Sequence, residues 1–328
     1  MRVAGIGQCS LDYLGVVGRY PEADEKAELC EWVEDGGGPA GTAVVTLARL
    51  GVPCAFFGVV GDDEAGRKVR SGFEVDGVDV RGLKIRRGET SQVAFIAIDK
   101  SSGTRTIFWR RPTGTELRPS EIPKDFPKGF DFVHLDGLMR EVSIFAAKKA
   151  RAAGVPVMLD AGRQRPWTLE IARHCDYVVG SEQFALDLGL RSEIAKKVLS
   201  LGVKACTITL GSRGSITFTK NDFFKTPAFK VDVVDTTGAG DVFHGAHIYG
   251  LLKKWDLRKV VRFASAVAAL KCIKIGGRKG IPTLRAALRL AGWHPRMGAT
   301  DNRRLFVCDG VDGVASSHEI VTGPSELC

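Results

Sequence analysis

One glycine-rich segment carries residue types that could do chemistry: Asp235-Thr236-Thr237-Gly238-Ala239-Gly240-Asp241. Its small residues let main-chain N–H groups approach an anion closely, and the helix that we predict from Gly240 adds positive potential there. Asp241 falls in the first turn of that helix, where a carboxylate is favoured, so we expect its pKa to stay low. A carboxylate beside an anion hole can accept a hydroxyl proton while a phosphoryl group is transferred. An ordinary N-cap after a glycine-rich turn would show the same pattern.

A second acid, Asp12, follows the first predicted strand, Val3–Ile6. It therefore lies at a carboxyl end of the predicted sheet, where open α/β folds bind their ligands. A carboxylate there can accept hydrogen bonds from two hydroxyl groups, which suits a polyol. An aspartate is too weak a base to ionise an alcohol outright, so proton transfer must accompany phosphoryl transfer.

The elements that must position these acids alternate between strands and helices. We predict strands at Val3–Ile6, Cys54–Val60, Phe132–Leu135, Val155–Asp160, Tyr177–Val179 and Ala205–Leu210. We predict helices at 40–50, 142–153, 168–174, 193–201, 240–254 and 257–271, and a β-rich hairpin at 91–111. Alternation of this kind predicts an α/β fold with a parallel sheet covered on both faces.

The composition narrows the class of protein. With 328 residues, 44% hydrophobic and 26% charged, the chain is globular and long enough to bury a large core. A net charge of +9 suits anionic partners such as phosphorylated small molecules. No basic tract interleaved with aromatic residues is present, so we expect no nucleic-acid partner.

The cysteines and apolar runs indicate the compartment. The eight cysteines form no Cys-x-x-Cys pair, and most lie in apolar runs, as small buried hydrophobes do. We also find no signal-peptide core and no apolar run of about 18 residues. The expectation is a cytoplasmic protein with reduced thiols that does not bind a membrane.

Four blocks, in order along the chain, match motifs of a known family: 37–51, Gly58–Asp62, Thr209–Gly214 and Asp235–Ala246. Over about residues 1–285 the chain resembles the ribokinase-like (PfkB) carbohydrate kinase family. The resemblance implies a three-layer ribokinase-like fold, with a mostly parallel sheet flanked by helices and a small β-sheet lid. We assign the kinase domain to 1–292, with the lid at about 13–35 and 91–111. Residues 293–328 form a C-terminal tail to which no role is assigned.

The resemblance also implies an activity, the transfer of the γ-phosphate of ATP to a sugar hydroxyl with Mg²⁺. By this likeness Asp241 is the catalytic base, and Gly238, Ala239 and Gly240 form the anion hole. The implied sugar-binding residues are Asp12, Gly37, Gly38 and Thr42. The implied ATP-binding residues are Ser181, Thr209, Gly211 and Gly214.

The chain departs from the family pattern at two positions. Thr42 stands where family members commonly carry Asn. The usual Asn-x-x-Glu block, which positions Mg²⁺, is here Ser181-Glu182-Gln183-Phe184, so Glu182 is the remaining candidate for that metal. Some family members also bind a monovalent cation such as K⁺. The corresponding positions here are Asp235, Thr237 and the backbone near Gly276 and Gly280.

Several further residues are candidates for substrate contacts or assembly. Arg105 in the hairpin and Arg163 after Asp160 could each bind an anionic group on the sugar, as Arg geometry favours. His244 and His247, three residues apart on a helix, could face one metal, but no third ligand is near in sequence, so we expect them to pack in the core or to support the site residues from behind. An exposed apolar face of the lid would allow a homodimer.

The sequence lacks the motifs of two other classes of nucleotide-binding enzyme. A nicotinamide-dependent oxidoreductase would need a third glycine or alanine after Gly5-Ile6-Gly7, where Ser10 stands. A P-loop enzyme would need a Gly-Lys-Ser/Thr sequence, which is absent. Two alternatives of the same fold stay open: a nucleoside kinase, and a non-catalytic sugar- or nucleotide-binding protein.

Overall fold

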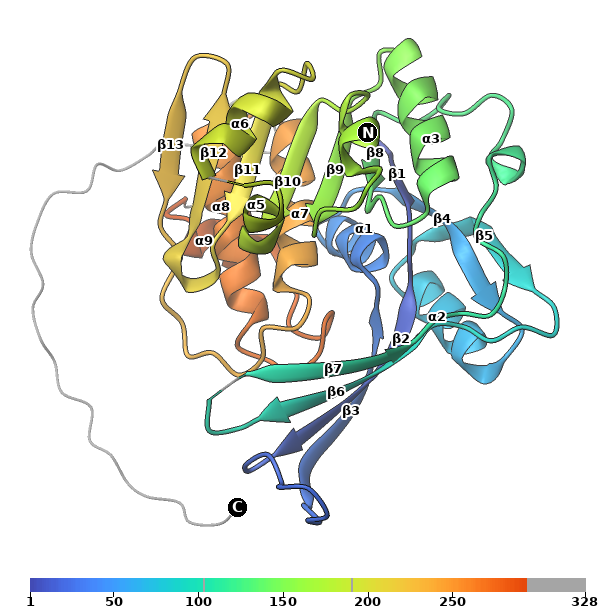
Figure 1. Cartoon of the computed structure of the whole chain (residues 1–328), viewed down its shortest axis with the longest axis vertical. Coiled ribbons are helices and arrows are strands. Elements are labelled where there is room, and N and C mark those ends of the chain that lie inside the picture. Colours follow the sequence, from blue (N-terminus) through green and yellow to red (C-terminus); the bar gives the residue numbers. More distant parts are fainter. Residues whose placement is uncertain (103, 190, 294–328) are drawn as a thin grey trace, which may run out of the picture.

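The computed structural model describes residues 1–102, 104–189 and 191–293, and these form two β-sheets (Figure 1). The larger sheet has nine strands in the order β13-β12-β11-β10-β9-β8-β1-β4-β5. Neighbours from β11 to β5 run parallel, and β12 and β13 add an antiparallel edge. The strands are β1 Val3–Ile6, β4 Cys54–Gly61, β5 Asp79–Arg86, β8 Phe132–Leu135, β9 Val157–Gly162, β10 Tyr177–Ser181, β11 Ala205–Thr209, β12 Ser215–Thr219 and β13 Phe223–Thr226.

Helices cover both faces of this sheet, as predicted. One core cluster contains side chains of α1 Pro39–Arg49, α2 Glu64–Val75, α7 Ala239–Leu252, α8 Leu257–Lys271 and α9 Leu284–Leu290. The other contains side chains of α3 Arg140–Ala152, α4 Thr168–Ala172, α5 Glu182–Asp187 and α6 Arg191–Leu199. Strand residues alternate between the two clusters, Val3 facing the first and Ala4 the second. The result is a three-layer arrangement of helix, sheet and helix.

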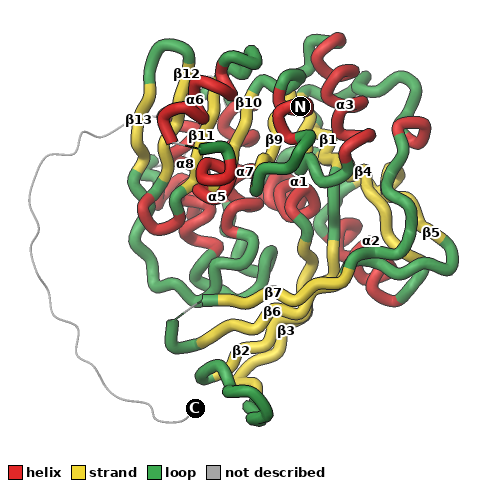
Figure 2. Tube along the Cα trace, viewed as in Figure 1, coloured by secondary structure: helices red, strands yellow, loops and turns green. Residues whose placement is uncertain are grey.

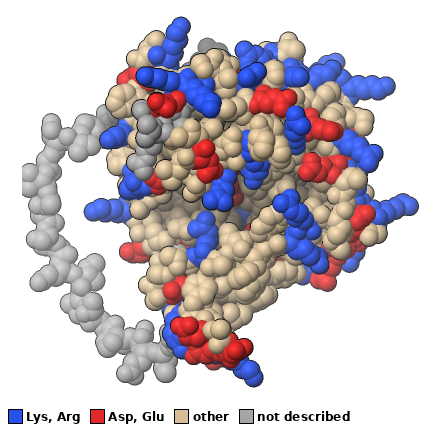
Figure 3. Space-filling model, viewed as in Figure 1, with Lys and Arg blue, Asp and Glu red and all other residues tan. Residues whose placement is uncertain are grey.

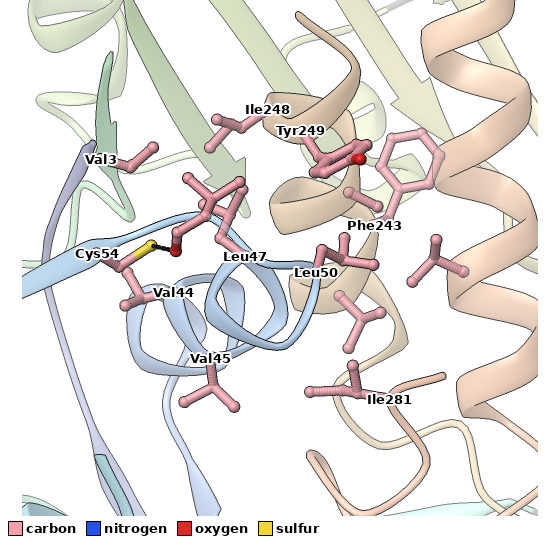
Figure 4. Packing of buried hydrophobic residues seen from close by; sticks show 14 of the residues in the cluster. Val3, Val44, Val45, Leu47, Leu50, Cys54, Phe243, Ile248, Tyr249 and Ile281 are labelled. Carbon is pink, nitrogen blue, oxygen red and sulfur yellow. Dashed lines mark hydrogen bonds between the residues drawn. The ribbon is translucent and has the colours of Figure 1, made fainter. Parts of the chain in front are cut away.

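Helices α1 and α7 pack closely together beside β1 (Figure 4). Gly245 allows the approach, because a Cβ at this position would lie 2.5 Å from the main-chain oxygen of Ala43. Val44, Leu47 and Phe243 fill the surrounding space and are fully or almost fully buried. This contact fixes the start of α7, which carries Asp241, against the helix that follows the glycines at 36–38.

The lid is a four-stranded sheet in the order β3-β2-β6-β7. Its strands are β2 Ser10–Val17, β3 Leu29–Gly37, β6 Val93–Asp99 and β7 Arg105–Arg110, so strands occur in both predicted lid segments. Strand β2 follows β1 after a short link, and the lid extends below the larger sheet (Figure 1). One lid face is apolar and buried, with Leu14, Val16 and Ile96 packed near Ile275.

The described C-terminal end is part of the core. Trp293 is buried, and its ring centroid lies 5.5 Å from that of Trp255 and 6.3 Å from that of Phe263. The rest of the predicted tail, 294–328, lies outside the described residues.

The cysteines and the helices bear on the expected compartment. The six cysteines of the described residues are free thiols, and five of them are buried. None of the helices in the described ranges has the length and apolar character needed to cross a membrane.

Candidate active site

Four aspartates, Asp12, Asp136, Asp160 and Asp241, interact electrostatically near the ends of the central strands. Figure 2 shows the lid strands below the ends of these strands. Asp12 lies in lid strand β2, Asp136 follows β8, and Asp160 lies in β9, which neighbours β8. Asp241 joins them from the first turn of α7. Parallel strands end at one edge of a sheet, so acids far apart in the sequence meet there.

The segment before Asp241 has the geometry of an anion hole. Gly238 is the N-cap of α7 and has a φ of 72°, a left-handed conformation that suits glycine. A Cβ on Gly240 would meet no atom within 4 Å, so the space in front of this residue is open. The first N–H groups of a helix have no partner within it and can bind an anion, but here the N–H of Ala239 already donates to the main-chain oxygen of Thr236 at 3.2 Å. Binding of a phosphoryl group by Gly238, Ala239 and Gly240 stays a prediction.

The expectation of a low pKa for Asp241 is wrong. Burial, and then the negative charge of Asp160, raise the pKa of Asp241 to about 6. Burial likewise raises the pKa of Asp12 to about 6 and that of Asp136 to about 7. The helix N-terminus favours a carboxylate, but loss of hydration and the other carboxylates outweigh it here. A carboxyl with a pKa near the working pH is suited to accept a proton.

His244 lies beside this acidic cluster, which agrees with one of the two roles that the sequence suggested for it. Its Nδ1 lies 2.6 Å from the main-chain oxygen of Gly240, and its Nε2 lies 3.3 Å from that of Val179 and 3.4 Å from Oδ1 of Asp160. The spacing of His244 three residues after Asp241, on one helix face, was the available signal.

His247 has the packing role that we expected of it. It is buried, its Nδ1 lies 3.4 Å from the sulfur of Met158, and burial lowers its pKa to about 3.

The glycines at 36–38 lie beside Asp12 and a buried arginine. A Cβ on Gly37 would lie 2.1 Å from Oδ2 of Asp12, and one on Gly36 would lie 2.2 Å from Nη1 of Arg278. The Arg278 side chain is buried, and its Nη2 donates to the main-chain oxygen of Gly37 at 2.8 Å. The positive charge of Arg278 also partly opposes the rise in the pKa of Asp12. Arg278 is therefore a positioning residue that sequence reasoning missed.

Two other predicted sugar contacts are placed nearby. Gly38 has a φ of 84° and precedes α1 as its N-cap. Thr42 is buried in α1, and its Oγ1 lies 3.5 Å from Nε of Arg278. Thr42 is thus beside Arg278, which in turn contacts Gly37.

The predicted ATP-binding residues lie together at the ends of β10 and β11. Ser181 and Thr209 are paired residues on these strands, and Ser181 caps α5 through its Oγ. Gly211 and Gly214 follow with φ values of 60° and 85°. A Cβ on Gly214 would lie 2.0 Å from the main-chain oxygen of Thr226, so only glycine fits there.

The candidate ligands for Mg²⁺ offer carboxylate oxygens at these strand ends. Glu182 begins α5 and forms an ion pair with Arg213 of the neighbouring loop. Phe184, where the family carries an acid, is fully buried against Gly180. Asp160 and Asp241 offer carboxylate oxygens within 4.8 Å of each other and of a ring nitrogen of His244. Mg²⁺ usually takes one or two carboxylates together with substrate phosphates, and this donor set fits that requirement.

The candidate ligands for a monovalent cation have other partners. Asp235 Oδ1 accepts from Thr237 N at 2.8 Å and from Thr237 Oγ1 at 2.7 Å. Its Oδ2 accepts from Gly276 N at 2.9 Å, and its main-chain oxygen accepts from Lys271 Nζ at 2.9 Å. An internal cation already contacts Asp235, so these residues do not fit an added K⁺.

The two predicted arginines are placed differently. Arg105 of β7 donates a hydrogen bond to Oγ1 of Thr236, two residues before Gly238. Because Arg105 pairs with Ile98, which pairs with Val16, it shares a lid face with Asp12. Arg163 is exposed after β9, and its main-chain oxygen accepts from Arg165 Nη1 at 3.2 Å. The lid therefore brings Arg105, but not Arg163, next to the anion hole.

Comparisons with known proteins agree with this geometry. The family model described as pfkB family carbohydrate kinase matches residues 2–284. An ATP-dependent ribose-1-phosphate kinase of Halopiger xanaduensis is 29% identical over 87% of this chain and 96% of its own length. An aminoimidazole riboside kinase of Salmonella typhimurium is 30% identical over 84% of this chain and 91% of its own. The structure of Arabidopsis thaliana ribokinase complexed with ribose and ATP matches with a TM-score of 0.75 and 25% identity, covering 88% and 98% of the two chains.

Proposed function

The chain belongs to the pfkB family of carbohydrate kinases, and on that premise we propose that it transfers the γ-phosphate of ATP to a hydroxyl group of a carbohydrate, with Asp241 as the base. The observation that carries the proposal is the position of Asp241. It is a partly buried carboxyl with a pKa of about 6, and it stands one residue after the anion hole. A family relationship alone does not assign these roles, so they rest on this geometry.

Proton transfer is the first task of the site. Asp241 accepts the proton of the acceptor hydroxyl as the oxygen–phosphorus bond forms, and the bond to the leaving ADP oxygen breaks. The neighbouring Asp160 and His244 set the charge around Asp241, since one raises and the other lowers its pKa. A base with a pKa near 6 is largely ionised at pH 7 and remains basic enough to take part in concerted transfer.

Charge on the transferred group is balanced by the anion hole and the lid. The main-chain N–H groups at the start of α7 point to where the phosphoryl group passes. The contact of Arg105 with Thr236 supports a role for this guanidinium at the phosphoryl group. Asp160 and Glu182 are the residues that would hold Mg²⁺, and the ion would neutralise negative charge on the ATP phosphates.

The acceptor is held from the lid side. Asp12 accepts from Ser10 Oγ at 2.7 Å and lies against Gly37, so its other oxygen is available for a sugar hydroxyl. Arg278 donates to the main-chain oxygen of Gly37, and its positive charge favours the ionised form of Asp12. Holding a hydroxyl near both Asp12 and Asp241 supplies the orientation on which such transfers depend.

An ADP-release assay tests the proposal. Sugars, sugar acids, sugar phosphates and nucleosides are offered with ATP and Mg²⁺ to the wild type and to Asp241→Asn. We expect the substitution to lower kcat on the preferred acceptor by about 100- to 10,000-fold. Asp232→Asn, the same change at an exposed position nearby, should leave the rate unchanged. Equal rates for wild type and Asp241→Asn on every acceptor would overturn the assignment.

The same panel distinguishes a nucleoside kinase from a sugar kinase. The similarity to an aminoimidazole riboside kinase favours this second candidate, because that relative acts on a riboside. Preference for a nucleoside would support it, whereas preference for a sugar or sugar phosphate would exclude it. Binding of ATP and sugar without turnover would instead identify a non-catalytic member of the fold.

We also propose that the lid joins two copies of the chain. Its outer face carries a row of stacked aromatic rings from Tyr13, Trp32, Phe95 and Phe108, with centroids 5.7 to 6.3 Å apart. Trp32 and Phe108 are 53% and 59% exposed. In Figure 3 the lid surface is mostly uncharged, with charged side chains gathered at its margins. Large exposed apolar faces of this kind are typical of association surfaces.

A further inference from the structure

A lysine is completely buried beside the anion hole. Lys271 is the last residue of α8, and its side chain is 0% exposed. Its Nζ donates to the main-chain oxygen of Asp235 at 2.9 Å and lies 3.6 Å from Oδ2 of the same residue, which is also 0% exposed. A buried charge is costly unless it is paired and hydrogen-bonded. Lys271 and Asp235 each meet that condition through the other.

The acid of this pair organises both walls of the anion hole. Asp235 Oδ1 accepts two hydrogen bonds from Thr237, the residue before Gly238. Asp235 Oδ2 accepts from the main-chain N–H of Gly276, and the next residue, Gly277, lies against Gly238. Asp235 thus ties the turn that begins the anion hole to the loop packed behind it.

The ammonium group takes the same kinds of ligand that an alkali cation takes in a protein. It is a compact unit charge, and its contacts here are a carbonyl oxygen and a carboxylate oxygen. A carboxylate that organises two loops needs a nearby positive charge, and Lys271 supplies that charge from within the chain. An added cation at Asp235 would stand next to an ammonium group and be repelled.

We propose that the Lys271 ammonium replaces a monovalent cation at Asp235, so that this kinase works without K⁺ or any other alkali ion. The inference rests on the proposed kinase function and adds a positioning residue to it. Lys271 does not touch the reacting atoms. It holds Asp235, and through Asp235 the turn 235–237 in front of Gly238.

The first experiment uses the wild type alone. Turnover on the preferred acceptor is measured in KCl, NaCl and tetramethylammonium chloride at equal ionic strength. We expect kcat/KM to agree within about twofold in the three salts, because the required charge is covalently attached. Activation by K⁺ of about tenfold or more over tetramethylammonium would overturn the proposal, and this outcome needs no variant to fold.

The second experiment removes the ammonium group. Lys271→Ala leaves a space beside Asp235 that an alkali or ammonium ion can enter, and Lys274→Ala removes an exposed lysine three residues away as the control. We expect kcat/KM of Lys271→Ala to fall at least tenfold in tetramethylammonium chloride and to recover in KCl or NH₄Cl. Lys274→Ala should match the wild type in every salt. A folded Lys271→Ala variant that no cation restores would mean that Lys271 is merely a packing residue.

A third measurement does not depend on activity. Thermal melting of Lys271→Ala should rise with KCl relative to tetramethylammonium chloride, while that of the wild type should not, because an ion that binds only the folded state stabilises it. If the alanine variant does not fold, Lys271→Gln serves in its place. Absence of turnover on every acceptor would refute the kinase proposal, whereas a K⁺-specific rise in the melting temperature of the wild type would refute only the replacement.

Discussion

At the scale of single residues, the site is defined by carboxyl groups whose pKa values are raised. Asp12, Asp136 and Asp241 all gain protons more readily than free aspartate because they are buried among other acids. Arg278 and His244 partly oppose this effect, since their charges lower the pKa of Asp12 and Asp241 respectively. These acids therefore gain or lose a proton at pH values of about 6 to 7.

These pKa values predict an acid limb in the pH profile of kcat/KM. Asp241 must be ionised to accept a proton, and its pKa is about 6, so activity falls as pH drops below that value. The fall should be about tenfold per pH unit if Asp241 alone matters. It should be steeper if the ionised form of Asp12, whose pKa is also about 6, binds the sugar.

Measurement of kcat/KM from pH 4.5 to 8.5 checks this expectation, with a stability control at each pH. Asp12→Asn should lower the activity. The pH profile of this variant should then show only the fall caused by protonation of Asp241. A flat profile down to pH 4.5 would contradict a raised pKa for the base.

At the scale of elements, the contact between α1 and α7 holds the base in place. The prediction concerns Gly245, whose Cβ would press on Ala43 and Thr46 of α1. Gly245→Ala should lower the free energy of unfolding by about 1–3 kcal/mol because it overpacks this contact. Gly72→Ala, within α2, meets no atom within 4 Å and should instead raise it by about 0.4–1 kcal/mol.

Urea unfolding of both variants measures the two changes. The pair is matched, since each places alanine at an interior position of a helix. Equal effects of the two substitutions would mean that helix propensity, not the contact between α1 and α7, determines the outcome.

The sequence predicted most helices and strands. It did not predict those whose formation depends on contacts with residues far away in the sequence. Strands β1 and β8 were predicted with their observed bounds because they are continuous apolar runs buried on both faces. Strand β5 was not predicted, because it is an edge strand in which charged residues such as Arg81 interrupt the apolar pattern. The last two antiparallel strands, β12 and β13, were likewise not predicted.

The same limit applies to the site. Asp241, Asp12 and the glycine turns could be recognised because each lies within a short motif. Arg278 could not, since it contacts Gly37 across 241 positions of sequence. The pKa of Asp241 was mispredicted because the helix terminus is visible in the sequence, whereas burial beside Asp160 is not.

At the scale of the whole molecule, the proposed dimer depends on the outer lid face. We expect a dimer in solution, and we expect Trp32→Lys with Phe108→Lys to give a monomer, because buried lysines would be unpaired. Light scattering coupled to size exclusion measures the mass of each. Phe223→Lys, an equally exposed aromatic residue on β13, is the control and should remain dimeric. A monomeric wild type at micromolar concentration would refute the lid interface.

The short loop from Gly276 to Gly280 contacts both the turn before α7 and the end of lid strand β3. Gly277 lies against Gly238, where we propose that phosphate binds, while the main-chain N–H groups of Arg278 and Lys279 donate to Asp35 near the end of lid strand β3. A shift of this loop would disturb nucleotide and sugar recognition together. Substitutions in this loop should therefore impair the binding of both substrates, whereas substitutions in the lid strands can change the sugar contacts alone.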